Sequence, residues 1–488
     1  KNLKWYLLIV ISTTMLFGYV LVFKSNIKDS FKRPNISLPN QEGESVLKDN
    51  KLVIPQILEN KSTTPNKAEF DLVVGYGEKE FIKGYVANTL GYNGDYLGPV
   101  IRVNKGDEVV INVNNQLKES TTVHWHGLKV DAIMDGGPHQ VILSKTTWKP
   151  NFTIEQPAAT LWYHPHLMHK TGKQVYKGLA GMFIIDDEYS QSLNIPKDYG
   201  VNDIPIIVQD KSFTSKGQIP YNLNMQNLMN GFMGDTVVIN GTINPQLEVK
   251  NEVIRLRVLN GSNARTYNFN FSDNNTFYQI ASDGGFLESS VEMSNVTLAP
   301  AERAEILLDL STYKVGDILA LKDGNLNLMT IKISKESFKE VSIPTTLVSI
   351  ENYDINNVVN KRKFVMSGMG PMVNINGRQM DLNYINEQVK INNLEEWTII
   401  NNSSQMGMMG RNNSTPHPFH IHGAQFRVIQ RNNQMPPLNE QGWKDTVMLN
   451  RDEEVKILIK FSKKGLFMYH CHILEHEDSG MMGQLLVE

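Results

Sequence analysis

The sequence predicts an all-β protein of three consecutive antiparallel β-sandwich or small-barrel domains, and three observations lead to this prediction. The length of 488 residues corresponds to about three domains of ordinary size. Short runs of alternating β-branched or apolar residues lie between turn residues, as in half-buried strands. Three segments of this kind resemble one another, which indicates an internal repeat.

Each repeated segment begins at a turn marked by glycine or asparagine and continues into strands. The segments are GPVIRVNKGDEVVINVNNQL (98–117), INGTINPQLEVKNEVIRLRVLNGS (239–262) and INGRQMDLNYINEQVKINNLEEWTIINNS (375–403). Apolar residues alternate at Val109, Ile111 and Val113 in the first segment, so one face of that strand should be buried. We expect the first domain over residues 66–190, the second over 191–345 and the third over 346–488.

The first 26 residues form a separate segment. Residues 5–23 carry no charge between Lys4 and Lys24, and this length just spans a bilayer core as a helix. A small-residue cleavage site is not evident, which favours a retained signal anchor, with a cleaved signal peptide as the alternative. Residues 27–65 are polar and contain several prolines, which is typical of a tether. We therefore predict an exported protein at the outer face of the cytoplasmic membrane, in the periplasm or at the cell surface.

Composition excludes several classes of protein. A hydrophobic content of 41% and a charged content of 20% are typical of folded globular chains. A net charge of −3 and the lack of a long basic run argue against nucleic acid as a partner. The single cysteine, Cys471, excludes an intrachain disulfide and is free for another role.

The histidines carry the strongest chemical signal. Only 12 occur in the chain, yet eight of them form four His-x-His pairs: His124/His126, His164/His166, His420/His422 and His470/His472. Cys471 lies inside the fourth pair. In a strand, residues i and i+2 face one way and i+1 the other, so the two imidazoles and the thiol should touch metal centres on opposite sides. That arrangement provides a short covalent path for electrons.

Two kinds of metal site follow from these residues. On the thiol side, His417, His476 and Met481 are available, and a His₂Cys site with a weak axial methionine is typical of blue copper. On the other side, eight histidines suit several metal ions held close together, whereas zinc usually takes four ligands. Since no histidine lies between His169 and His417, the first and third domains should touch, and the second should be a spacer.

The chain resembles the multicopper oxidases. Four motifs support this: HWHG (124–127), WYHPH (162–166), HPFHIH (417–422) and HCHILEHEDSGMM (470–482). Further stretches, such as GYNGDYLGP, QPAAT, NGSNAR and GWKDTV, look like the bacterial copper-efflux (cuprous) oxidases, and the bilirubin-oxidase and spore-coat laccase branches are related. The resemblance implies three cupredoxin-like Greek-key β-sandwich domains.

The resemblance also implies four copper ions per chain. Type 1 copper would take His417, Cys471, His476 and Met481, and type 2 would take His124 and His420. One type 3 copper would take His126, His164 and His472, and the other His166, His422 and His470. Electrons would pass through Cys471 to dioxygen, which would become water, and Asp135 and Glu477 would supply or relay the protons.

The resemblance further suggests Cu(I) as the substrate. Candidate thioether ligands are Met406, Met408 and Met409, and also Met366, Met369 and Met372; a third methionine group includes Met225, Met229 and Met233. Asn413 falls near the position of an acidic residue in the cuprous oxidases, which is a departure from their pattern. We expect a monomeric, membrane-tethered oxidase of Cu(I). The alternatives are a laccase or bilirubin-oxidase-like enzyme that takes small organic reductants, a copper nitrite reductase, and a non-enzymatic electron-transfer cupredoxin.

Overall fold

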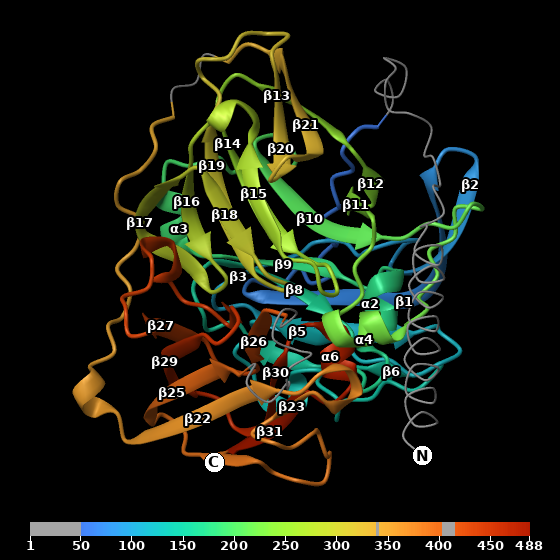
Figure 1. Cartoon of the computed structure of the whole chain (residues 1–488). Coiled ribbons are helices and arrows are strands. Elements are labelled where there is room, and N and C mark those ends of the chain that lie inside the picture. Colours follow the sequence, from blue (N-terminus) through green and yellow to red (C-terminus); the bar gives the residue numbers. More distant parts are fainter. Residues whose placement is uncertain (1–49, 338–340, 403–414) are drawn as a thin grey trace, which may run out of the picture. The chain divides into compact units, whose positions relative to one another are not determined.

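The computed structural model describes residues 50–337, 341–402 and 415–488. The predicted signal segment (1–26), residues 27–49 of the predicted tether, and Met406, Met408 and Met409 lie outside the described residues. In the described part, strands dominate and form six sheets, so the expected all-β fold class is confirmed (Figure 1). No helix of this part is long and apolar enough to cross a membrane.

The first pair of sheets encloses one hydrophobic core. One sheet has the order β2-β1-β4-β6, with β7 also paired to β4, and the other has the order β3-β9-β8-β5. The strands are β1 (Lys67–Ile82), β2 (Tyr85–Tyr92), β3 (Ile101–Asn104), β4 (Glu108–Asn115), β5 (His124–His126), β6 (Thr147–Trp148), β7 (Asn151–Thr153), β8 (Ala159–His164) and β9 (Gly181–Asp186). Burial alternates along β4, with Val109, Ile111 and Val113 in the core, as predicted.

The middle pair encloses a second core. Its sheets have the orders β12-β11-β10-β14-β19-β16-β17 and β13-β21-β20-β15-β18. The strands are β10 (Asp203–Lys211), β11 (Thr236–Ile239), β12 (Thr242–Ile243), β13 (Gln246–Lys250), β14 (Val253–Asn260), β15 (Tyr267–Phe271), β16 (Phe277–Ser282), β17 (Gly285–Met293), β18 (Asn295–Leu298), β19 (Arg303–Asp309), β20 (Ile318–Asp323) and β21 (Leu326–Lys335).

Strand β14 corrects the prediction of half-buried strands, because it is buried on both faces. Leu256 and Val258 lie in the core. On the opposite face, Arg257 is also buried, pairs with Asp203, and donates a hydrogen bond to Thr160 of β8. The polar face of β14 is therefore covered by the first pair of sheets, and its charge is neutralised within the protein.

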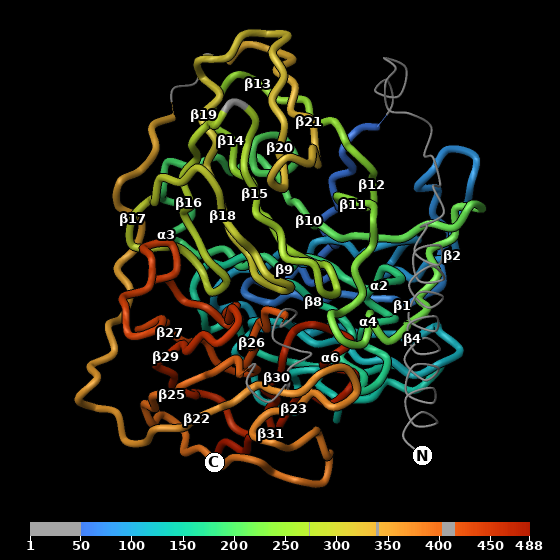
Figure 2. Tube along the Cα trace, in the orientation of Figure 1, coloured from blue at the N-terminus to red at the C-terminus, as the bar shows by residue number. Residues whose placement is uncertain are grey.

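The third pair encloses a third core. Its sheets have the orders β23-β22-β25-β29-β27 and β24-β31-β30-β26-β28. The strands are β22 (Asn360–Ser367), β23 (Asn374–Ile375), β24 (Glu387–Val389), β25 (Leu394–Asn401), β26 (His417–Ile421), β27 (Phe426–Arg431), β28 (Thr446–Leu449), β29 (Glu454–Lys460), β30 (Gly465–Cys471) and β31 (Met482–Val487). Figure 2 shows the three pairs as separate colour regions, blue to cyan, green to yellow, and orange to red.

Each of the six sheets contains one parallel pair of strands among its antiparallel pairs, a detail that the predicted fold class does not include. The pairs are β1/β4, β3/β9, β10/β14, β13/β21, β22/β25 and β24/β31. Every repeated segment found in the sequence supplies two of these strands, one to each sheet of its pair: β3 and β4, β13 and β14, β24 and β25. Parallel neighbours need a crossover connection, so the chain passes between facing sheets at the same point of each repeat. The repeat in the sequence is thus a repeat in the fold.

Short helices occupy the connections. They are α2 (Thr171–Lys177), α3 (Glu188–Ser192), α4 (Met225–Asn230) and α6 (Leu474–Asp478), with 3-10 turns η1 (Ala132–Met134), η2 (Ser272–Asn274), η3 (Ile355–Asn357), η4 (Gly370–Met372) and η6 (Leu438–Glu440). Helix α6 contacts both α2 and α4, and α4 contacts η4 (Figure 1). Segments from all three pairs of sheets therefore meet around α6, which follows the His470-Cys471-His472 tripeptide.

Part of the predicted tether belongs to the folded body. Leu52 is buried in the middle core and its N–H donates to the carbonyl of Gln246. The N–H of Leu58 donates to the carbonyl of Val100. An apolar side chain and backbone hydrogen bonds therefore fasten residues 52–58, within the predicted tether, to two pairs of sheets.

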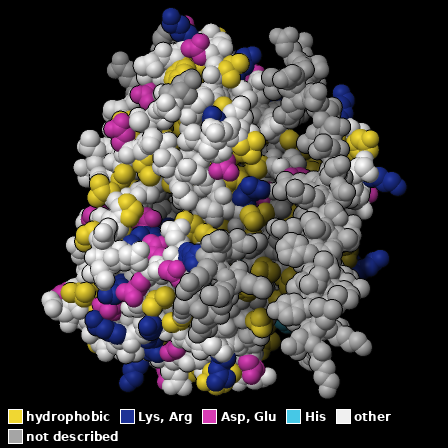
Figure 3. Space-filling model, in the orientation of Figure 1, with side chains coloured by type: hydrophobic (Ala, Val, Ile, Leu, Met, Phe, Trp, Pro, Cys, Tyr) yellow, Lys and Arg dark blue, Asp and Glu magenta, His cyan; other side chains and the backbone are white. Residues whose placement is uncertain are grey.

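The visible surface carries charges of both signs. In Figure 3, basic and acidic side chains are interspersed on the face that is shown, and no large basic patch is seen there.

Candidate metal centre

The eight paired histidines lie together at the seam between the first and third pairs of sheets. Antiparallel pairing places His124 of β5 opposite His164 of β8, and His420 of β26 opposite His470 of β30. Rings stack across the seam: His124 on His422, with centroids 3.8 Å apart, and His126 on His420, at 3.7 Å. All eight rings are buried. The contact expected between the first and third domains is therefore present.

In most of these rings, one nitrogen lies against a hydrogen-bonding group of the surrounding protein and the other points toward the centre of the histidine cluster. Nδ1 of His124, His164, His420 and His470 lies 2.7–3.1 Å from a backbone carbonyl oxygen. A carbonyl only accepts, so Nδ1 carries the hydrogen and Nε2 keeps its lone pair. Nε2 of His124 and of His420 is buried without a hydrogen-bond partner in the described part. Orphaned acceptor nitrogens of this kind are what a metal ion would satisfy.

Two carboxylates lie beside rings of the cluster. Asp135 Oδ2 lies 2.7 Å from His422 Nδ1, and the two oxygens of Glu477 each lie 3.4 Å from Nδ1 of His166 or His470. The Nε2 atoms of these rings converge, with His470 Nε2 3.0 Å from that of His166 and 3.1 Å from that of His422. Three lone pairs this close repel one another unless a cation lies among them.

The ring of His126 has the opposite orientation. Its Nε2 lies 3.0 Å from Asp445 Oδ1, so Nδ1 faces the cluster, 3.4 Å from His164 Nε2. The donor atoms fall into the groups His166/His422/His470, His124/His126/His164 and His124/His420/His422. The first group coincides with one expected type 3 set. His472 is absent from these groups, although both its ring nitrogens lack hydrogen-bond partners among the described residues and its ring lies 5.1 Å from that of His126.

The thiol of Cys471 lies in a second cluster. His417 Nδ1 is 3.3 Å and His476 Nδ1 is 3.9 Å from the Cys471 sulfur, and all three side chains are buried. Met481 is fully buried, follows Gly480 at φ +96°, and is tied by backbone hydrogen bonds to Cys471 and His476. His470 and His472 lie with the eight-histidine cluster, so the tripeptide touches both clusters.

Burial controls protonation at both clusters. It lowers the pKa of the His470 ring to about 3 and of the His476 ring to about 4, and those of the other buried ligand rings with a resolved shift well below the ordinary value. The rings are therefore neutral, as metal ligands must be. Burial also raises the pKa of the Cys471 thiol and that of Glu477 well above their ordinary values. Binding a cation at Cys471 must thus displace a proton.

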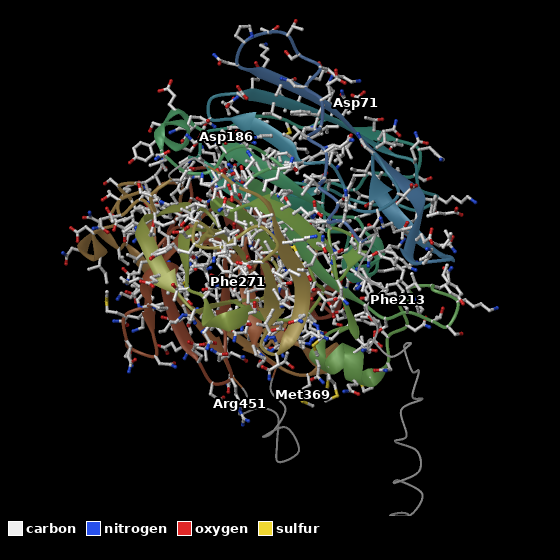
Figure 4. All side chains as sticks on the ribbon, turned by 90° about the horizontal axis from the view of Figure 1, so that it is seen from above. Asp71, Asp186, Phe213, Phe271, Met369 and Arg451 are labelled. Atoms are coloured by element: carbon white, nitrogen blue, oxygen red, sulfur yellow. The ribbon has the colours of Figure 1, made fainter. Side chains whose placement is uncertain are left out.

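Helix α4 and turn η4 cover the Cys471 cluster. Met229, at the end of α4, accepts a hydrogen bond from His476 Nε2 through its carbonyl, at 3.1 Å. Met229 and Met369 line a small cavity together with His417 and His476, and Figure 4 shows Met369 close to α4. Met372 is 72% exposed. Met366 is fully buried and packs in the third core.

Asp445 and Arg303 lie beside the cluster and are not among the predicted site residues. Asp445 is fully buried and contacts both His126 and His420, and Arg303 of the middle pair forms an ion pair with it. The middle pair is therefore more than the predicted spacer. The motif GWKDTV contains Asp445, but Arg303 lies in a stretch without histidines, so no local pattern connects it to the metal centre.

Comparisons with known proteins agree with this site. Two protein-family models, both described as multicopper oxidase, match this sequence, one over residues 74–190 and the other over residues 345–488. The chain is 43% identical over 438 residues to a multicopper oxidase of Staphylococcus haemolyticus, covering 90% of this chain and 92% of that one. It is also 34% identical over 459 residues to the cell division protein FtsP of Escherichia coli, covering 89% and 92%.

Solved structures have the same fold. A laccase from Pediococcus acidilactici superposes with a TM-score of 0.85 at 39% identity, covering 90% of this chain and 94% of that one. A laccase-like multicopper oxidase, CueO, from Ochrobactrum sp. gives a TM-score of 0.82 at 34% identity, covering 90% and 100%. With donor sets suited to copper, three repeated pairs of sheets and this similarity over nine-tenths of its length, the chain belongs to the multicopper oxidase family.

Proposed function

We propose that this multicopper oxidase oxidises Cu(I) near Cys471 and reduces dioxygen to water at the eight-histidine cluster. Four Cu(I) ions would each lose one electron, and dioxygen would take four electrons and four protons to give two water molecules. The observation that supports this most is the His470-Cys471-His472 tripeptide, whose thiol lies with His417 and His476 while its imidazoles lie in the other cluster.

The proposal includes four copper ions with the ligands that the family resemblance implies. Bound copper would supply one-electron exchange at Cys471 and the centre at which dioxygen is reduced. His417, Cys471, His476 and Met481 would form the type 1 site. The geometric group His166/His422/His470 supports one type 3 set. The remaining rings would bind the other two ions in the way that the family resemblance implies. His124 and His420 would hold the type 2 ion, and His126, His164 and His472 would hold the second type 3 ion.

Two acids are suited to move protons into the histidine cluster. Asp135 lies against His422, and its second oxygen, Oδ1, has no partner in the described part. Glu477 lies between His166 and His470, and burial raises its pKa well above the ordinary value. A buried carboxyl beside the cluster is placed to donate a proton and to be reloaded.

Methionine placement supports Cu(I) as the electron donor. Thioethers bind Cu(I) well and bind hard ions poorly. Met369 and Met229 line the small cavity over the Cys471 cluster. The sulfur of Met225 lies near Gly370, the residue that follows Met369 and begins turn η4. His476 Nε2 is covered by the Met229 carbonyl, so a bulky donor cannot contact that edge directly in this arrangement.

A laccase activity toward small organic donors is the second candidate. The similarity to a Pediococcus acidilactici laccase favours it. Export to the outer face of the membrane rests only on the apolar segment of residues 5–23 and remains a prediction, as does the monomeric state.

Copper counting with oxygen uptake tests the proposal. The chain loaded with copper should hold about four ions and consume dioxygen when Cu(I) is supplied. Replacing Met225, Met229 and Met369 together by leucine should weaken Cu(I) oxidation and leave oxidation of a small phenol intact or enhanced. Met435→Leu is the matched control, since Met435 is 77% exposed and does not line the cavity. One copper per chain, or no oxygen uptake with any donor, would reject the oxidase mechanism; unchanged Cu(I) oxidation in the triple variant would reject the methionine site alone.

A further inference from the structure

A buried arginine of the middle pair of sheets satisfies all of its hydrogen-bond donors beside the histidine cluster. Arg303 begins β19, and its side chain has no exposed surface. A guanidinium has five N–H donors. Nε donates to Thr160 O at 3.0 Å, one terminal nitrogen to Ala301 O and Asp445 Oδ1, and the other to Asp283 O and Asp445 Oδ2. Five donors thus have five acceptors, and the side chain can adopt no other position without losing some of them.

These acceptors come from all three pairs of sheets. Thr160 belongs to β8 of the first pair, Ala301 and Asp283 to the middle pair, and Asp445 immediately precedes β28 of the third. The contact to Asp445 is a two-pronged ion pair with N···O distances of 2.8 and 2.6 Å. Such planar pairs fix the orientation of a carboxylate as well as its position.

Asp445 in turn contacts histidines from both sides of the seam. Its Oδ1 lies 3.0 Å from His126 Nε2, and its backbone oxygen lies 2.8 Å from His420 Nδ1. This carboxylate is the partner that turns His126 so that Nδ1, unlike in the neighbouring rings, faces the cluster. Gly127 leaves space for the contact, because a Cβ there would lie 2.5 Å from Asp445 Oδ2 and 3.0 Å from the Arg303 guanidinium.

We infer that Arg303 is a positioning residue for copper at the seam: it holds Asp445 in place and thereby fixes the ring orientations of His126 and His420. The inference rests on the proposed copper function of the eight-histidine cluster. Loss of the guanidinium leaves a buried carboxylate without its cation, which must then take up a proton or move. Either change removes the charged partner of His126 Nε2 and leaves it only the Thr446 hydroxyl, 3.2 Å away, so the ring is less firmly held with its donor nitrogen toward the cluster.

Arg257 provides a matched control. It is also a buried arginine of the middle pair, it forms a two-pronged ion pair with Asp203, and it also contacts Thr160. None of its acceptors contacts a histidine of the cluster in the described part of the chain. Losing Arg257 should therefore destabilise the fold in the same way without disturbing His126 or His420.

The test compares Arg303→Met, Arg303→Lys and Arg257→Met in the full chain. Each protein is loaded with copper, titrated with a chelator, and examined by electron paramagnetic resonance for the type 2 and type 1 signals. Removing a residue that orients a metal ligand weakens metal binding by about 10- to 100-fold. We expect this loss, and an altered type 2 signal, in both Arg303 variants, with an unchanged type 1 signal. Arg257→Met should keep the copper affinity and both signals of the wild type.

Two outcomes would overturn the inference: wild-type copper affinity and type 2 signal in Arg303→Met, or equal losses in Arg303→Met and Arg257→Met. If Arg303→Met does not fold, Asp445→Asn replaces it, since the amide keeps the shape and removes the charge; a wild-type signal there would also contradict the inference. A wild-type protein that binds no copper at the seam would instead reject the proposed function, so the two failures are distinct.

Discussion

Replacing Gly136 by alanine should disable the histidine cluster through a backbone collision. Gly136 follows Asp135 and has φ +79°, and a Cβ there would lie 1.7 Å from the carbonyl oxygen of Val123 and 3.0 Å from the Cα of His124. That contact must open to at least 3.0 Å, so the loop and β5 must separate by about 1.3 Å. Ligand geometry in a working site tolerates about 0.5 Å, and a displacement of about 1 Å can lower the rate by about 100-fold.

Gly106→Ala separates this collision from backbone strain. Gly106 has φ +94°, and its added Cβ would meet nothing within 4 Å. Both substitutions should cost about 1–2 kcal/mol for the left-handed conformation, and Gly136→Ala about 1–3 kcal/mol more for the collision. The assay is copper content, oxygen uptake with saturating donor, and the urea midpoint of each variant. Equal copper content and turnover in the two variants would show that the collision at Gly136 does not disturb the histidine cluster.

Three further predictions concern the thiol, the substrate and the response to pH. Cys471→Ser should lose the blue colour and all turnover and hold one copper fewer than the wild type; residual turnover would show a second electron path. Changing Met225, Met229 and Met369 to leucine should raise the KM for Cu(I) more than the KM for a phenol, and parallel changes would contradict a thioether site. Burial lowers the pKa of Lys211 to about 7, so between pH 7 and 10.5 the unfolded chain binds a proton that the folded chain does not, and stability rises with pH. That gain, about 2–3 kcal/mol from pH 7 to 9, should vanish in Lys211→Met, as urea midpoints at both pH values will show.

The sequence predicted those parts of the protein that depend on local pattern. Period-two alternation identified β4, and the spacing of His470, Cys471 and His472 indicated two clusters, because strand geometry alone separates neighbouring side chains. The alternation of residue types in β14 predicts a half-buried strand, because Arg257 is a polar residue. In the structure Arg257 is buried, since the first pair of sheets packs against that face of β14. Parallel pairing within every sheet was also missed, since strand direction depends on connections between sheets.

The residues that orient the histidines could not be found in the same way. Arg303 reaches Asp445 across 142 positions of the chain, and His476 meets the carbonyl of Met229 across 247. Such contacts depend on how whole pairs of sheets pack, and the side chains involved have no distinctive spacing. Met366 lies in a methionine-rich stretch that suggests copper binding, and the alternation of β22 places its side chain in the core.

The central claim is that electrons from Cu(I) reach dioxygen through Cys471. The most direct measurement is the number of Cu(I) ions oxidised per dioxygen consumed by the copper-loaded chain, with hydrogen peroxide assayed in the same sample. We expect four Cu(I) ions per dioxygen, no peroxide, and no consumption by Cys471→Ser. Two Cu(I) ions per dioxygen with release of peroxide, or undiminished consumption by Cys471→Ser, would contradict it.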